Sequence, residues 1–224
     1  MVCPQGVLTC PEMDGYSDMR VYFVRHGESV ANVEDTFSST DPAIHPLTHT
    51  GVEQVAELAE TLKTVTFEAA YCSDLLRAVQ TVEILLNGCG LEYRVDQRLR
   101  EHNMGVFDGR SDKGAWDALR ELVRIWDEDG QTEVEPDGGE SLDVLQERFF
   151  TFIDDLERDA KDDDAIILIV AHVGLFWSTL PRLFTNIDRA FVRAREFGNA
   201  GVVIGAHHRG TWTCESWVGE KLPD

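Results

Sequence analysis

The sequence is poor in basic residues, and in lysine above all. Its 224 residues include four lysines and 20 basic residues in total, against 41 acidic ones, for a net charge of −21. Nucleic acids and anionic membranes bind proteins through basic surfaces, so this composition argues against both as partners. An anionic ligand must therefore be held by a local group of arginine and histidine side chains, against an unfavourable overall field.

The sequence also lacks long apolar runs and a paired cysteine pattern. Its longest apolar candidate, residues 165–171, is far shorter than the roughly 20 residues that span a membrane. Residues 1–19 have neither a basic start nor a long apolar stretch, so we expect a flexible leader instead of a signal peptide, and a cytoplasmic protein. The five cysteines show no paired spacing, which argues against a disulfide framework.

Short apolar runs alternate with segments of helical periodicity along the chain. The predicted strands are 20–24, 67–72, 91–95 and 165–170. The predicted helices are 52–62, 75–86, 115–126 and 142–156, and a further helix is expected after His172. Ser73 or Asp74 is the expected cap of helix 75–86. Residues 202–206 and 211–218 are typical of a hairpin at the edge of a sheet. This alternation predicts an α/β fold, a three-layer α/β/α sandwich with a mostly parallel central sheet, in one domain over 20–224.

Histidine and arginine residues follow three of these predicted strands. Arg25 and His26 follow the first strand, His172 follows strand 165–170, and Arg77 comes just after strand 67–72. Ligands of parallel sheets bind at the carboxyl ends of the strands, so we expect these side chains to meet there.

This group of residues suits the transfer of a phosphoryl group. Arginine holds two phosphate oxygens at once, and a neutral imidazole is a nucleophile that forms a covalent intermediate. We expect a backbone carbonyl near Gly27 to hold the second ring nitrogen of His26, and Gly27 to let the chain turn closely around the phosphate. A protonated His172 would neutralise part of the phosphate charge. Glu101 is the candidate proton donor to the leaving oxygen.

Five segments, in order, resemble the histidine phosphatase superfamily, also called the phosphoglycerate-mutase-like family. They are Arg25-His-Gly-Glu-Ser29 with Asn32; Pro46-Leu-Thr48 with Gly51 and Gln54; Ser73 to Thr81; Leu99-Arg-Glu101 with Gly105 and Gly109; and Ala171-His172. The resemblance covers roughly residues 20–205. One departure is Val173, since the second histidine of the family is usually followed by glycine.

The resemblance implies a phosphoglycerate-mutase-like fold and a metal-independent enzyme without a cofactor, acting on a small phosphorylated substrate. His26 would be the phosphorylated nucleophile and Glu101 the proton donor. The resemblance places Arg25, Arg77 and His172 in the phosphate pocket, and Asn32 at its lining. We expect no metal site, because no histidine or cysteine spacing is that of a zinc site.

The family contains both phosphatases and mutases, and the sequence favours a phosphatase. Mutases of the family usually carry a long insertion with extra basic residues after the proton-donor segment. Here only about thirty residues separate Gly109 from Gly139, and they are acidic. The alternatives are phosphoglycerate-mutase-type transfer and a non-catalytic module that binds a phospho-ligand or a protein. The apolar residues Met104, Phe107, Trp116 and Trp126 are either a wall of the substrate pocket or core. The sequence carries no signal for the oligomeric state.

Overall fold

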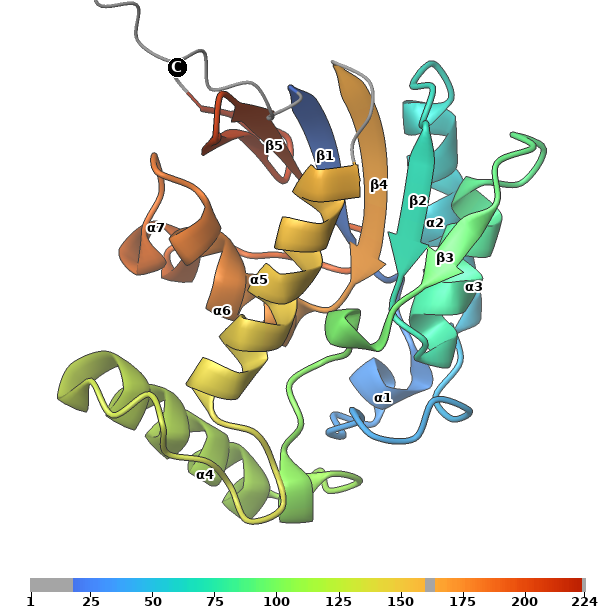
Figure 1. Cartoon of the computed structure of the whole chain (residues 1–224). Coiled ribbons are helices and arrows are strands. Elements are labelled where there is room, and N and C mark those ends of the chain that lie inside the picture. The colour runs from blue at the N-terminus through green and yellow to red at the C-terminus, as the bar shows by residue number, and fades with distance from the viewer. Residues whose placement is uncertain (1–17, 160–163, 223–224) are drawn as a thin grey trace, which may run out of the picture.

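A seven-stranded mixed sheet forms the centre of the computed structural model, which describes residues 18–159 and 164–222 (Figure 1). The strands are β1 (Met19–Arg25), β2 (Ala69–Cys72), β3 (Tyr93–Val95), β4 (Ala165–Ala171), β5 (Val202–His208), β6 (Thr211–Trp217) and β7 (Glu220–Lys221). Their order is β3-β2-β4-β1-β5-β6-β7. The first four in this order pair in parallel, and β5, β6 and β7 continue the sheet with antiparallel pairs.

Helices cover both faces of the sheet, as the predicted three-layer α/β fold requires (Figure 1). The helices are α1 (Val30–Val33), α2 (His49–Leu62), α3 (Leu76–Leu85), α4 (Lys113–Arg124), α5 (Leu142–Asp159), α6 (Val173–Leu183) and α7 (Arg189–Arg193). Shorter turns are η1 (Gln97–Leu99), η2 (Gly105–Phe107) and the π-helical η3 (Ile125–Asp129), which continues α4. Within the ranges 18–159 and 164–222, no helix has the length and apolar character needed to cross a membrane.

The central strand β4 is buried on both faces, which explains its unbroken apolar sequence. Ile167 and Ile169 pack into the core formed with α5 and α6, whereas Leu168 and Val170 pack into the core formed with α2 and α3. Alternate residues of a strand point to opposite faces, so each face of β4 supplies one of the two cores.

The two ends of the chain were predicted to be a leader and a hairpin. Residues 1–17 of the expected leader lie outside the described residues, and Met19 already belongs to β1. The predicted hairpin is present as β5 and β6, joined at Arg209 and Gly210, both of which have positive φ angles. The two-residue strand β7 pairs with β6 on its outer side.

Helix α3 begins differently from the predicted capping by Ser73 or Asp74. Its N-cap residue is Leu75, which has no side-chain cap, and Asp74 instead pairs with Arg100. The buried face of α3 carries Arg77 and Ala78 beside apolar residues. The helix therefore turns a charged side chain toward the interior.

Gly27 and Gly51 let two backbone segments touch. A Cβ atom on Gly27 would lie 2.6 Å from the carbonyl oxygen of Gly51, and one on Gly51 would lie 2.0 Å from the carbonyl oxygen of Glu28. Both distances are shorter than van der Waals contact, so a side chain at either position would push α2 away from the loop after β1. The structure thus accounts for Gly27 by helix packing, whereas the sequence had suggested a close turn around phosphate.

Candidate active site

The carboxyl ends of β1 and β4 bring two histidines together. In the parallel register Arg25 lies beside Ala171, and the amide of His26 donates to the carbonyl of Ala171 at 3.1 Å. A histidine directly follows each strand, His26 after β1 and His172 after β4. The ring centroids of the two histidines are 5.1 Å apart. Both rings are buried.

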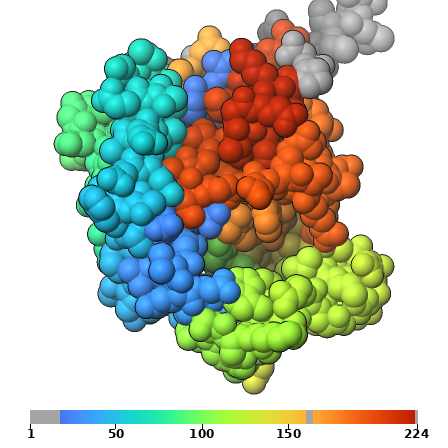
Figure 2. Space-filling model, turned by 180° about the vertical axis from the view of Figure 1, so that it is seen from behind, coloured from blue at the N-terminus to red at the C-terminus, as the bar shows by residue number. Residues whose placement is uncertain are grey.

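A cavity of about 340 Å³ opens in front of His26. It is lined by five of the residues that the sequence singled out, namely Arg25, His26, Asn32, Arg77 and Glu101. His172 is not among the lining residues. Figure 2 shows the surface hollowed where the blue segment after β1, the yellow-green α4 and the orange segment containing α6 and α7 meet.

Two contacts agree on the tautomer of His26. Its Nδ1 lies 2.7 Å from the carbonyl oxygen of Gly27, which only accepts, so Nδ1 carries the proton. Its Nε2 lies 3.1 Å from the Nε–H of Arg77, which only donates, so Nε2 carries the lone pair. The expected carbonyl partner near Gly27 is confirmed, and it leaves Nε2 as the nucleophilic atom.

Both buried histidines are held neutral in the free protein. Burial, with smaller contributions from Arg77 and Arg25, lowers the pKa of His26 well below its usual value. Burial followed by the charge of Arg77 does the same to the pKa of His172. The protonated His172 that the sequence suggests beside a phosphate is therefore not favoured in the free protein, because a buried cation beside arginines is unfavourable without a bound anion.

These shifts predict a loss of stability in mild acid. In the unfolded chain each histidine binds a proton below about pH 6.5, whereas in the folded chain it stays neutral to lower pH. Each therefore lowers the free energy of unfolding by up to about 1.4 kcal/mol per pH unit as the pH falls below about 6.5. Urea unfolding from pH 8 to 5 measures this slope.

A pair of variants separates the buried histidines from the exposed ones. We expect His26→Asn to reduce the slope by up to about 1.4 kcal/mol per pH unit, since one group whose pKa falls on folding is lost. His49→Asn is the control, because the side chain of His49 is 90% exposed. An unchanged slope in His26→Asn would show that His26 is already protonated in the folded protein.

The two arginines differ in how their donors are used. Arg77 is buried, and besides His26 it donates to Ser38 through Nη1 to Oγ at 3.3 Å and Nη2 to the carbonyl at 2.7 Å. Burial lowers the pKa of Arg77 to about 10, so it stays charged at neutral pH. Arg25 donates from Nη1 to the carbonyl of Phe197 at 2.6 Å, and its buried Nε has no partner within the described part of the chain.

Glu101 is held at the N-terminus of α6 by backbone amides. Its carboxylate accepts from His102 at 2.8 Å, Gly174 at 3.1 Å and Leu175 at 2.9 Å. A Cβ atom at position 174 would lie 2.4 Å from Oε1 of Glu101. Only glycine at position 174 leaves the carboxylate in this place, whereas Val173, one position earlier, lines the cavity.

An ion pair between Arg148 and Glu140 fixes the segment that carries Glu101. Arg148 pairs with Glu140 at 2.7 Å and also donates to the backbone carbonyl of Glu101 at 3.2 Å. Glu140 in turn accepts from the amide of Asn103 at 2.9 Å. Sequence reasoning missed Arg148 because its position on α5 shows no relation to Glu101 until the chain is folded.

Asn32 lies at the exposed rim of the cavity. Its Oδ1 accepts from the amide and hydroxyl of Ser29, each at 3.0 Å, and from the Nδ2 of Asn199 at 3.1 Å. Asn199 also donates to the carbonyl of His26 at 3.3 Å. Asn32 thus ties the loop after β1 to the segment before β5.

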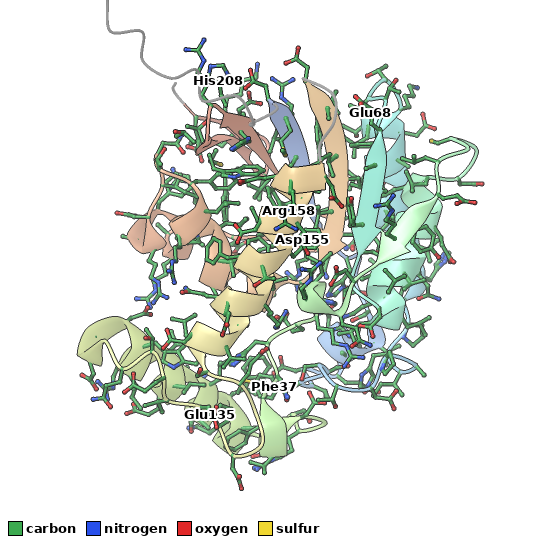
Figure 3. The ribbon with its side chains drawn as sticks, viewed as in Figure 1. Phe37, Glu68, Glu135, Asp155, Arg158 and His208 are labelled. Atoms are coloured by element: carbon green, nitrogen blue, oxygen red, sulfur yellow. The ribbon has the colours of Figure 1, made fainter. Side chains whose placement is uncertain are left out.

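Aromatic side chains form the outer wall of the cavity. Met104 and Trp116 line it, as one of the two sequence-based alternatives expects, together with Phe37 and Trp177. The rings of Phe37 and Trp116 are 4.3 Å apart, at the α4 end of the molecule, the end far from His208 (Figure 3). Trp126, by contrast, belongs to the core. The sequence carried no signal that would single out Phe37 or Trp177 as lining residues.

Comparisons with known proteins agree with this geometry. A family model described as histidine phosphatase superfamily, branch 1, matches residues 21–219. An adenosylcobalamin/alpha-ribazole phosphatase of Salmonella typhimurium is 33% identical over 167 residues, which are 75% of this chain and 80% of the relative. A probable phosphoglycerate mutase of Cronobacter sakazakii is 28% identical over 213 residues, 92% and 93% of the two chains.

A solved structure resembles the whole fold as well. The native structure of a mycobacterial glucosyl-3-phosphoglycerate phosphatase has a TM-score of 0.73 at 27% identity, and the match covers 90% of this chain and 99% of that one. The family match spans nearly the whole described chain and includes the site around His26. The protein therefore belongs to branch 1 of the histidine phosphatase superfamily.

Proposed function

We propose that the protein is a metal-independent phosphatase that hydrolyses phosphomonoesters through a phosphohistidine on His26. The observation that carries this proposal is the environment of His26. Its Nε2 is unprotonated and lies in a cavity that also holds two arginines and the carboxylate of Glu101. A nucleophile, charge-neutralising donors and a proton-transfer group are the parts that phosphoryl transfer needs.

The proposed first step moves the phosphoryl group to the protein. The Nε2 lone pair of His26 attacks phosphorus, the P–N bond forms, and the bond from phosphorus to the ester oxygen breaks. Protonated Glu101 gives its proton to the departing oxygen, so the alcohol leaves neutral. Arg25 and Arg77 bind the three remaining phosphoryl oxygens, in place of the present contact from Arg77 to His26.

The second step returns the protein to its starting state. Ionised Glu101 takes a proton from water, the water oxygen attacks phosphorus, and the P–N bond breaks. Inorganic phosphate leaves, and His26 regains its lone pair. His172 lies close enough to His26 to donate to the phosphoryl oxygens, and the negative charge of bound phosphate favours its protonated form.

A phosphatase fits the chain better than a mutase does. The segment between Gly109 and Gly139 forms α4 and η3, with Asp112, Asp117 and Glu121 on its surface, so it does not favour a ligand with two phosphates. Two of the similar proteins described above carry phosphatase names, whereas one is named a probable mutase. Whether water or a second hydroxyl takes the phosphoryl group separates the two activities.

Trapping the intermediate tests the proposal. The protein is mixed with an aryl phosphate and a chelator, quenched in alkaline denaturant, which preserves phosphohistidine, and digested for mass spectrometry. We expect one phosphoryl group on the peptide containing His26, and its loss in acid. A phosphoryl group on another residue would overturn the mechanism. Isomerisation of phosphoglycerate that depends on 2,3-bisphosphoglycerate and is far faster than hydrolysis would show that the protein is a mutase and not a phosphatase.

A further inference from the structure

A second cavity continues from the active-site cavity. It also measures about 340 Å³, and it shares four lining residues with the first, namely His102, Leu119, Gly174 and Trp177. The second cavity runs between α4, η3, α6 and α7. Because the two cavities meet at these four residues, we expect a substrate whose phosphate lies at His26 to extend into the second cavity.

The walls of the second cavity are mostly apolar. Val123, Trp126 and Val192 contribute to them, and Trp177 stands at the junction with 46% of its surface exposed. A tryptophan that is so exposed and lines both cavities favours an apolar or aromatic ligand over a polar one.

The far end of the second cavity has an excess of positive charge. Arg189 and Arg193, both on α7, pair with the single carboxylate of Asp127 on η3. Figure 1 shows α7 on the same side of the molecule as α4, and the two ion pairs join α7 to η3, which continues α4. Asp127 is only 10% exposed in its side chain and is the one carboxylate in the described lining, so two cations share one anion. One guanidinium is therefore available for an acidic group of a ligand.

We propose that the natural substrate is an elongated phosphomonoester whose alcohol part has an apolar body and a singly charged acidic group at its far end. The phosphate binds at His26, the apolar body lies along Trp177, and the acidic group pairs with Arg189 and Arg193. This inference rests on the proposed phosphatase function and adds the class of its substrate.

Three synthetic alkyl esters test it: ethyl phosphate, 6-phenylhexyl phosphate, and the same phenylhexyl ester with a carboxylate in the para position of the ring. The quantity measured is kcat/KM for the carboxylated ester divided by kcat/KM for its neutral partner. We expect a ratio of about five in the native protein, as for a partly exposed ion pair at low salt, and a lower ratio at high salt. A ratio within one protein does not depend on how much of that protein is folded.

Variants with opposite charge effects sharpen the test. The double variant Arg189→Gln/Arg193→Gln should bring the ratio to about one, and Asp127→Asn should raise it, because the carboxylate no longer competes. Arg120→Gln is the control, since Arg120 lies on α4, is not among the lining residues of the second cavity, and pairs with Asp117 at the surface. It should leave the ratio unchanged.

The outcomes separate this inference from the proposed function. Hydrolysis of ethyl phosphate with a ratio near one in the native protein would overturn the acidic group and leave the proposed phosphatase function intact. Equal kcat/KM for ethyl phosphate and 6-phenylhexyl phosphate, whose leaving alcohols are similarly basic, would overturn the apolar extension. If none of the three esters is hydrolysed, both the proposed phosphatase function and this inference are overturned.

Discussion

Replacing His26 with alanine is expected to slow the hydrolysis of an aryl phosphate by about 10⁵-fold, the order of loss seen when a nucleophile is removed. The reason is that the Nε2 of His26 is unprotonated and lies in the cavity beside the guanidinium groups of Arg77 and Arg25. The measurement is kcat/KM with a chelator present in every assay. The variant should stay folded, since it loses a buried polar ring that resists protonation.

The matched control is His49→Ala, which removes a histidine whose side chain is 90% exposed. It should keep full activity. Equal turnover by the native protein and His26→Ala would take His26 out of the mechanism. Activity that disappears on chelation would show that a metal ion, and not the histidine, carries the reaction.

Replacing Glu101 with glutamine is expected to have an effect that depends on the leaving group. For an alkyl phosphate kcat/KM should fall by about 10³-fold, because the alkoxide cannot leave without a proton. For p-nitrophenyl phosphate the fall should be about tenfold or less, because nitrophenolate is weakly basic and leaves unprotonated. Comparing the two substrates in one variant isolates proton donation from other roles. Equal losses on both would show that Glu101 binds substrate instead.

Gly174→Ala should reproduce the dependence on leaving group expected for Glu101→Gln, although the carboxylate itself is chemically unchanged. The added methyl group meets Oε1 of Glu101 at 2.4 Å, and a displacement of about 1 Å is expected to cost about 10²-fold in rate. Gly198→Ala is the control, because a Cβ atom there meets nothing within 4 Å. A fully active Gly174→Ala would mean that the carboxylate moves without consequence.

The parts of the site predicted from sequence are those that follow directly from strands. His26 and His172 come one residue after apolar runs, and parallel strands bring their carboxyl ends to one edge. Arg77 was found from its place after the next strand. The fold class followed from the same alternation of strands and helices, with the mixed character of the sheet coming from the antiparallel β5, β6 and β7.

Other features depend on contacts between distant segments and had no local signal. Ser38 supports Arg77 from 39 positions away, and Arg148 holds the carbonyl of Glu101 from 47 positions away. The cap of α3 was mispredicted because Asp74 has a better partner in Arg100, which no short window of sequence contains. Likewise Gly27 looked like a phosphate-turn residue because its contact with Gly51 exists only after α2 has packed.

The unpaired polar atoms beside His26 bear on how the protein behaves in solution. Within the described residues, both ring nitrogens of His172 and the Nε of Arg25 are buried without a hydrogen-bond partner. Such atoms cost about 1–3 kcal/mol each, and an oxyanion bound at His26 offers them acceptors. A ligand that binds only the folded chain raises the free energy of unfolding with its concentration. The melting temperature of this protein is thus partly a property of the buffer, and it should be higher in phosphate or sulfate than in chloride.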